Sequence, residues 1–267
     1  MVRGLYTSAS GALVAQANVD QIANNLANVN TNGFKRSLMA VMSDQEMPLY
    51  RIQTDPGQAP DAAIPGVPTM TPVGPLGLGA QVVDTPTDFE QGVLEQTGNP
   101  LDVALEGSGF FAIQTPQGIR YTRDGSFVRN AQGLLATKDG SLVLGRNGAI
   151  ALPASGEILI DAKGAISVRP PGGAVVQPLD QLRIVTFADP LRLRPEGATR
   201  FVDYGARPAA DTTTTVSQGM LEKSNADVIT SMVGLIVNER WFDANEKSIQ
   251  TQDQANQMVI EQVGRVS

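Results

Sequence analysis

NADVITSMVGLIVNERWFDANEKSIQTQDQANQMVIEQVGRVS, residues 225–267, is the stretch from which we interpret the fold. Counting by seven from residue 228, five of the six positions are apolar and the remaining one is Asn256. Positions seven apart share one side of a helix, and such a repeat is typical of a helix packed against another helix. We predict a helix of about 38 residues, roughly 57 Å long. The alternative is an ordinary core helix. The predicted pairing positions are Val228, Leu235, Phe242, Ile249 and Val263.

A second helical pattern spans residues 2–30, where apolar and small residues recur at spacings of three and four. Its Ala-rich side allows close approach of a second helix. Gly4 and Gly11 each weaken a helix by about 1 kcal/mol relative to Ala, so this helix needs a partner. We predict that the two terminal helices pair as a coiled coil; the alternative is two separate surface helices. The pairing positions predicted here are Leu5, Ala9, Ala12, Val19, Ala23 and Leu26.

The segment between these helices divides into two parts that differ in sequence pattern. Six prolines between residues 55 and 75 disfavour regular structure and predict an extended connector, or alternatively a disordered linker. From residue 81 the period changes to two, with turn residues every eight to ten positions, which predicts an all-β domain. The fold class is therefore α+β. The predicted segments are 1–36 (N-terminal helix), 37–80 (Pro-rich connector), 81–217 (β-rich domain) and 218–267 (C-terminal helix).

Composition excludes several classes of function. The 267 residues contain no Cys and no His, so thiol nucleophiles, His general bases and Cys/His zinc sites are absent. A net charge of −7 argues against nucleic acid as a partner. No apolar run reaches membrane-spanning length, and no continuous apolar segment follows Arg3, so we expect neither membrane insertion nor a cleaved signal peptide. We predict no cofactor and no metal.

Carboxylates are the remaining catalytic candidates. Paired carboxylates can hydrolyse glycosides, and Asp84, Asp88, Glu90 and Asp102 are available. They stand among turn residues, where we expect them to be solvated, so we do not predict an enzyme. The run 107–109, Gly-Ser-Gly, lacks the Lys and helix of a phosphate-binding loop. Membrane-binding terminal helices are disfavoured by their low Lys content.

Three motifs stand out from this background. Residues 23–28 read ANNLAN and are followed by TNGF at 31–34; the row of amides could link neighbouring chains. Residues 101–111 read LDVALEGSGFF, and we expect the paired Phe110 and Phe111 to anchor the β core. Residues 121–127 read YTRDGSF.

These motifs resemble signatures of the bacterial flagellar axial proteins, the rod and hook subunits. Residues 218–225 are similar to the segment that precedes the C-terminal helix in that family. The end of the chain is more similar to proximal than to distal rod subunits. Trp241 replaces a residue that is small in the family, and its role is unassigned. The family-motif residues are Asn24, Asn25, Leu26, Ala27, Asn28, Thr31, Gly33, Phe34, Asp102, Gly107, Gly109, Phe110, Phe111, Tyr121, Arg123, Gly125 and Phe127.

The resemblance implies a structural subunit of the rod in the flagellar basal body. Such a subunit polymerises with copies of itself and with other rod and hook proteins into a tube that transmits torque and leaves an export channel. It also implies export by the flagellar type III apparatus without a cleaved signal peptide, and terminal helices that order only on assembly. The alternatives are a hook subunit, or an unrelated secreted β protein with helical ends.

Overall fold

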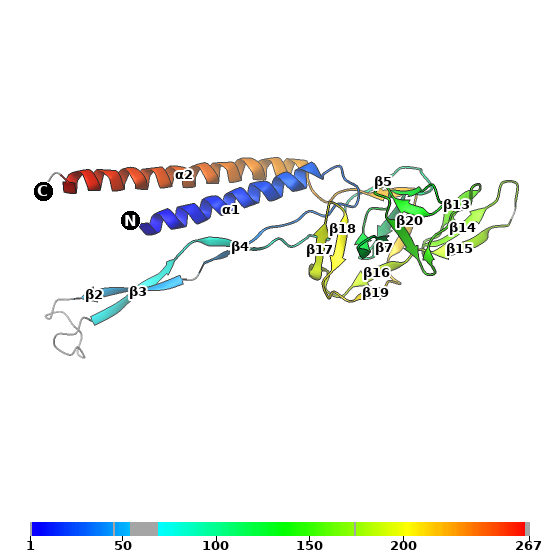
Figure 1. Ribbon diagram of the computed structural model, residues 1–267, viewed down its shortest axis with the longest axis horizontal. Coiled ribbons are helices and arrows are strands. Elements are labelled where there is room, and N and C mark those ends of the chain that lie inside the picture. The colour runs from blue at the N-terminus through cyan, green and yellow to red at the C-terminus, as the bar shows by residue number, and fades with distance from the viewer. Residues whose placement is uncertain (1, 45, 54–68, 174, 265–267) are drawn as a thin grey trace. The chain divides into compact units, whose positions relative to one another are not determined.

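The computed structural model (Figure 1) describes residues 2–44, 46–53, 69–173 and 175–264. The chain forms two compact units. Unit 1 contains Met1–Ile22, Met39–Thr85 and Val233–Ser267, and unit 2 contains Ala23–Leu38 and Pro86–Met232. Each unit is assembled from segments far apart in sequence, and the division into four segments stays a prediction.

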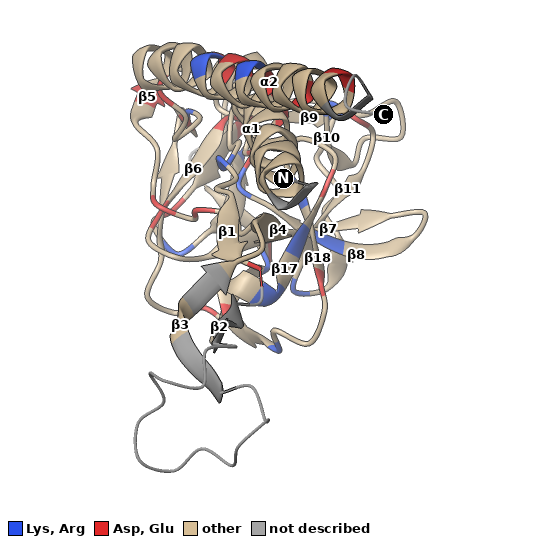
Figure 2. Ribbon diagram, turned by 90° about the vertical axis from the view of Figure 1, so that its left-hand side faces the viewer, with Lys and Arg blue, Asp and Glu red and all other residues tan. Residues whose placement is uncertain are grey.

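Two long helices provide most of unit 1. Helix α1 (Val2–Ala27) and helix α2 (Val228–Gly264) run antiparallel, side by side, through this unit (Figure 1). The 37 residues of α2 extend for about 56 Å, as predicted. Figure 2 shows charged residues along α2, whereas α1 contains only Arg3 and Asp20. Among the described residues, no helix combines the length and hydropathy needed to cross a membrane.

The described part of the expected Pro-rich connector is extended but paired, since it contains four strands; its role as a connector stays a prediction. Strands β1 (Ala40–Ser43) and β4 (Ala80–Asp84) pair, as do β2 (Glu46–Gln53) and β3 (Thr69–Gly77). Pro72 and Pro75 lie within β3. A two-stranded ribbon consists of edge strands only, and edge strands tolerate proline because half of their N–H groups need no partner. Residues 54–68, with the other four prolines, lie outside the described residues.

The main sheet of unit 2 has ten strands, in the order β17-β18-β8-β7-β11-β10-β9, with β12, β16 and β19 joined at its sides. All its pairings are antiparallel. The bounds are β7 (Phe110–Thr115), β8 (Gly118–Thr122), β9 (Phe127–Arg129), β10 (Leu135–Thr137), β11 (Leu142–Gly145), β12 (Gly148–Ala149), β16 (Ile184–Phe187), β17 (Leu193–Glu196), β18 (Arg200–Asp203) and β19 (Pro208–Ala210).

Three smaller sheets complete unit 2. Strands β13 (Glu157–Ile160), β14 (Ala165–Arg169) and β15 (Gln177–Gln181) form one. Strand β6 (Val103–Glu106) pairs with β20 (Thr215–Gln218), and β5 (Leu94–Gln96) pairs with β21 (Met220–Glu222). The 3-10 helix η1 (Pro190–Arg192) precedes β17. No individual strand was predicted within residues 188–217, because their Arg and Pro residues hide the period-two pattern.

The core of unit 2 lies on both faces of β7. Phe110 and Phe111 are both buried, as predicted, but they enter different clusters because successive strand residues point to opposite faces. Phe111 packs edge-on against Phe127 with ring centroids 5.0 Å apart, and Phe110 packs edge-on against Phe187 at 5.5 Å. The two adjacent Phe residues therefore anchor β7 in the hydrophobic clusters on both of its faces.

Candidate assembly site

Polar side chains connect the two helices within unit 1. Ser8 Oγ lies 3.0 Å from Ser248 Oγ, and Asn18 Nδ2 donates to Asn238 Oδ1 at 2.8 Å. Asn238 is buried, and its own Nδ2 donates to the Gly234 carbonyl at 2.8 Å. The helices are thus aligned by hydrogen bonds, which specify one register more sharply than apolar contacts do.

Glycines supply the remaining close approaches between the helices. A Cβ added to Gly4 would lie 2.7 Å from Gln252 Nε2, and one added to Gly11 would lie 2.9 Å from Asn245 Oδ1. A Cβ on Gly234 would lie 3.1 Å from Ile22. These contacts recur at heptad spacing, and we call them the contact row: Gly4, Ser8, Gly11, Asn18 and Ile22 on α1, with Gln252, Ser248, Asn245, Asn238 and Gly234 on α2.

The predicted pairing positions lie beside the contact row. On α1, Leu5 and Ala12 follow Gly4 and Gly11 by one residue, and on α2 Leu235 and Ile249 follow Gly234 and Ser248. One residue turns the side chain by about 100° around a helix, so these positions flank the contact row. Leu5, Ala9, Ala12, Val19, Leu26, Val228, Leu235, Phe242 and Ile249 are half-buried, and Ala23 is exposed. The side chain of Val263 lies outside the described residues. That these positions serve assembly stays a prediction.

A buried cluster of charges lies in unit 2. Lys35 Nζ contacts Glu222 Oε1 at 2.6 Å and donates to the Glu90 carbonyl at 2.6 Å. Glu222 Oε1 also accepts from Gly92 N at 2.9 Å. Burial lowers the pKa of Lys35, and the neighbouring carboxylate of Glu222 offsets part of that effect. The two side chains are fully withdrawn from solvent, so each depends on the other.

Arg123 completes this charge cluster, which we define as Lys35, Arg123 and Glu222. Arg123 Nη1 lies 3.5 Å from Glu222 Oε2, and Nη2 donates to the Gly107 carbonyl at 2.7 Å. The guanidinium stacks over the Phe110 ring at 4.8 Å from its centroid. Burial lowers the pKa of Arg123, and the charge of Glu222 opposes the shift. Two cations around one carboxylate make Glu222 the central member.

Backbone turns hold the segments that carry this cluster. Gly33 has a φ of +68° and donates its N–H to the Glu222 carbonyl at 2.8 Å. Asn25 is buried, donating to the Ser37 carbonyl at 2.9 Å and accepting from Ser37 N at 3.0 Å. Asn225 accepts from Arg36 N at 2.7 Å. The expectation that the asparagine row links neighbouring chains was therefore wrong for Asn25, because its amide binds its own chain.

The other motif residues build turns and core around the same cluster. Asp102 is buried and accepts from Thr97 Oγ1 at 2.7 Å, so its expected solvation was wrong. Asp88 likewise accepts from Arg36 Nε at 2.8 Å. A Cβ on Gly125 would lie 1.7 Å from the Val103 carbonyl, which explains the glycine. Three aromatic motif residues are buried: Phe34, Tyr121 and Phe127. In the turns, Gly109 N donates to Thr214 Oγ1, and Asn28 accepts from Thr31. The last turn of helix α1 contains Asn24, Leu26 and Ala27.

Several residues were missed at the sequence level. Lys35 and Glu222 stood beside motif residues, but nothing in their local pattern reveals a partner 187 positions away. The contact row left a detectable signal, because Gly4, Gly11, Asn18 and Asn25 follow one another at intervals of seven. Apolar periodicity alone points to the adjacent positions.

Comparison with known proteins gives three family matches along the chain. Residues 5–35 match the flagella basal body rod protein family, residues 104–168 the flagellar hook protein FlgE/F/G D1 domain, and residues 217–262 the flagellar basal body rod FlgEFG protein C-terminal family. The flagellar basal-body rod protein FlgG of Borreliella burgdorferi is 35% identical over 262 residues, covering 95% of this chain and 96% of the relative. This chain belongs to the flagellar basal-body rod protein family.

Further relatives of this rod protein carry the same kind of name. FlgG of Bacillus subtilis is 34% identical, covering 97% of this chain and 98% of its own. The flagellar basal-body rod protein FlgF of Caulobacter vibrioides is 29% identical over the full length of both chains. Each of the three family segments contributes one member of the charge cluster: Lys35, Arg123 and Glu222, respectively. The cluster thus connects the three segments of the chain that match these families.

Proposed function

We propose that this chain is a structural subunit of the flagellar rod, polymerising with copies of itself and other rod and hook proteins into an axial tube. The tube transmits torque from motor to hook and leaves a channel for exported subunits. The charge cluster is the observation that supports this role best, because it links three distant segments within a buried, ion-paired junction. A junction of that kind resists being pulled apart, since separating its members leaves unpaired buried charges.

We further propose that α1 and α2 act as a coiled coil, with the contact row as its interface and the flanking apolar positions turned to neighbouring subunits. The polar contact row supports this, because it specifies register while adding little burial. Neighbours would then provide the burial, so the helices order on assembly. Export by the flagellar type III apparatus and a role without catalysis, cofactor or metal belong to the same proposal.

The test is deletion of the gene followed by electron microscopy of basal bodies. We expect loss of the hook and filament, with an inner ring or truncated rod remaining. The length of the truncated rod reports the position of the subunit along the axis, where the proximal assignment stays a prediction. Intact, motile filaments would contradict a rod role. The names of the relatives favour a rod subunit over a hook subunit. A deletion strain with a full-length rod and no hook would instead favour a hook subunit.

A further inference from the structure

Trp241 is an exposed aromatic side chain on the α2 part of unit 1. It is the one Trp of the chain, and 61% of it is accessible. The contact row places position 241 opposite Ala15, which is buried. Gly4, Gly11 and Gly234 bring the helices too close for an indole to lie between them. Among the described residues, the indole N–H has no hydrogen-bond acceptor, so Trp241 offers both an apolar ring and an unused donor.

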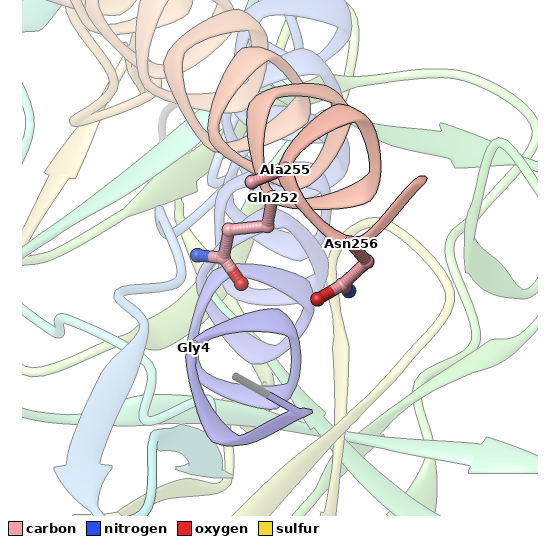
Figure 3. Close-up of a pocket in the computed structure, with 4 residues that line it drawn as sticks. All are labelled: Gly4, Gln252, Ala255 and Asn256. Atoms are coloured by element: carbon pink, nitrogen blue, oxygen red, sulfur yellow. The ribbon is translucent and has the colours of Figure 1, made fainter. Parts of the chain in front are cut away.

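A cavity of about 300 Å³ lies further along the same helix pair, lined by Gly4, Gln252, Ala255 and Asn256 (Figure 3). Gly4 lacks a side chain there, so the Gln252 amide lies against the backbone of α1 and forms one wall of the cavity. Gln252 Oε1 is buried without a hydrogen-bond partner, and the polar side chain of Asn256 also lines the cavity. The cavity therefore offers an unused acceptor. Pockets of this volume enclose small organic groups, and an indole ring is such a group.

We propose that Trp241 of one copy inserts into the Gly4–Gln252 cavity of the next copy in the rod, with its indole N–H donating to an amide oxygen of Gln252 or Asn256. This contact rests on the proposed function, because it joins copies of this chain. Size and hydrogen-bond complementarity select the occupant, because a large aromatic donor meets an open cavity that contains the unpaired acceptor Gln252 Oε1. Aromatic side chains that fill a partner's pocket commonly dominate the binding energy of an interface.

The geometry makes this contact head-to-tail. Residues 241 and 252–256 are 11 to 15 positions apart on one helix, or about 16–22 Å, so Trp241 cannot reach its own cavity. Trp241 and the cavity are different surfaces of the same chain, so each copy uses one surface toward each neighbour. Repeating such a contact produces an open filament when the rotation between copies does not close a ring. If the helices of adjacent copies run parallel, those copies are displaced along the axis by about 20 Å.

The test uses the absence of cysteine from the chain. The variant Trp241→Cys/Ala255→Cys is expressed in the deletion strain, basal bodies are isolated and mildly oxidised, and this chain is detected after denaturing electrophoresis. We expect a ladder of covalent multimers, because each copy bonds to the next. The matched control is Trp241→Cys/Gln257→Cys, whose second thiol is turned by about 200° around α2 from position 255, away from the cavity. The proposed contact would be overturned by covalent dimers without larger multimers, or by the absence of any cross-linked product from motile cells. An equal ladder from the control variant would overturn it as well.

If the double-cysteine variant fails to assemble, the number of hooks per cell in single variants tests the same contact. We expect Trp241→Ala to reduce the number of hooks per cell by roughly tenfold, as for an interface anchor, and Trp241→Phe to restore part of the loss. Ile236→Ala removes another exposed apolar side chain of α2 and serves as the control, with hook number unchanged. Normal hook numbers with Trp241→Ala would overturn the contact. The proposed function fails separately, if the deletion strain itself still builds intact, motile filaments.

Discussion

The helix pair of unit 1 and the β core of unit 2 are stabilised in opposite ways. Unit 2 buries large apolar side chains on both faces of β7, including Phe110, Phe111 and Phe127. In unit 1, the buried positions among the described residues are only Ser8, Ala15 and Asn238. Apolar burial is the main source of folding free energy, so unit 2 can be stable alone whereas the helix pair is weakly stabilised. Its hydrogen bonds instead specify alignment.

The strongest test of this contrast is Glu222→Ala in unit 2. The change leaves the buried cations of Lys35 and Arg123 without their carboxylate, which costs about 3–5 kcal/mol of unfolding free energy. Denaturant unfolding followed by circular dichroism measures it. The control is Glu157→Ala, whose pair with Arg169 is exposed and contributes less than about 1 kcal/mol. Equal losses for the two variants would show that the cluster is not a stabilising junction.

A second change tests the turn that leads into the cluster. Gly33→Ala puts a Cβ 2.3 Å from Asp124 N at a φ of +68°, and we expect a loss of about 1–3 kcal/mol or more. Gly140→Ala is the matched control, because Gly140 has a φ of +84° with no atom near its missing Cβ. The difference in thermal midpoint between the two variants isolates the backbone clash. No difference would mean that residues 33 and 124 can separate freely.

The alignment role of the contact row can be tested with Asn18→Ala. This change leaves Asn238 Oδ1 buried without its donor and should cost about 1–2 kcal/mol of helix-pair stability, read from thermal loss of helicity. Asn24→Ala, an exposed amide on the same helix, is the control. The double change Asn18→Leu/Asn238→Leu should raise helicity while relaxing register. If the double change lowered helicity instead, the polar pair would be a stabilising contact and the contrast with unit 2 would weaken.

The smallest expected effect concerns the start of α2. Asp227 Oδ2 accepts from Thr230 Oγ1 and from Thr230 N at 2.7 Å, and these hydrogen bonds lower the pKa of Asp227. A lowered folded-state pKa adds stability above the unfolded value, and this stability is lost as pH falls through the folded value. We expect Asp227→Asn to flatten the loss of helicity between neutral pH and strong acid. An unchanged acid titration would show that Asp227 does not cap α2.

Sequence patterns predicted the elements better than their contacts. The long α2, the β-rich body and the buried Phe pair followed from periodicity and local motifs, because those signals lie within a few residues of each other. Lys35 and Glu222 could not be paired from sequence, since a salt bridge over 187 positions leaves no local pattern. The contacts of the contact row lie one residue from several predicted pairing positions, because polar and glycine contacts follow a recurrence of Gly and Asn that apolar periodicity does not include.

The charge cluster also imposes an order in time. Under the proposed export with the N-terminus leading, Lys35 and Arg123 leave the channel before Glu222, which follows 187 residues after Lys35. Until that carboxylate arrives, two cations must remain hydrated rather than enter the interior, so unit 2 cannot close. Under the same proposal, completion of the fold is coupled to passage of nearly the whole chain. The exported subunit then stays open until the segment that carries Glu222 and leads into α2 has emerged.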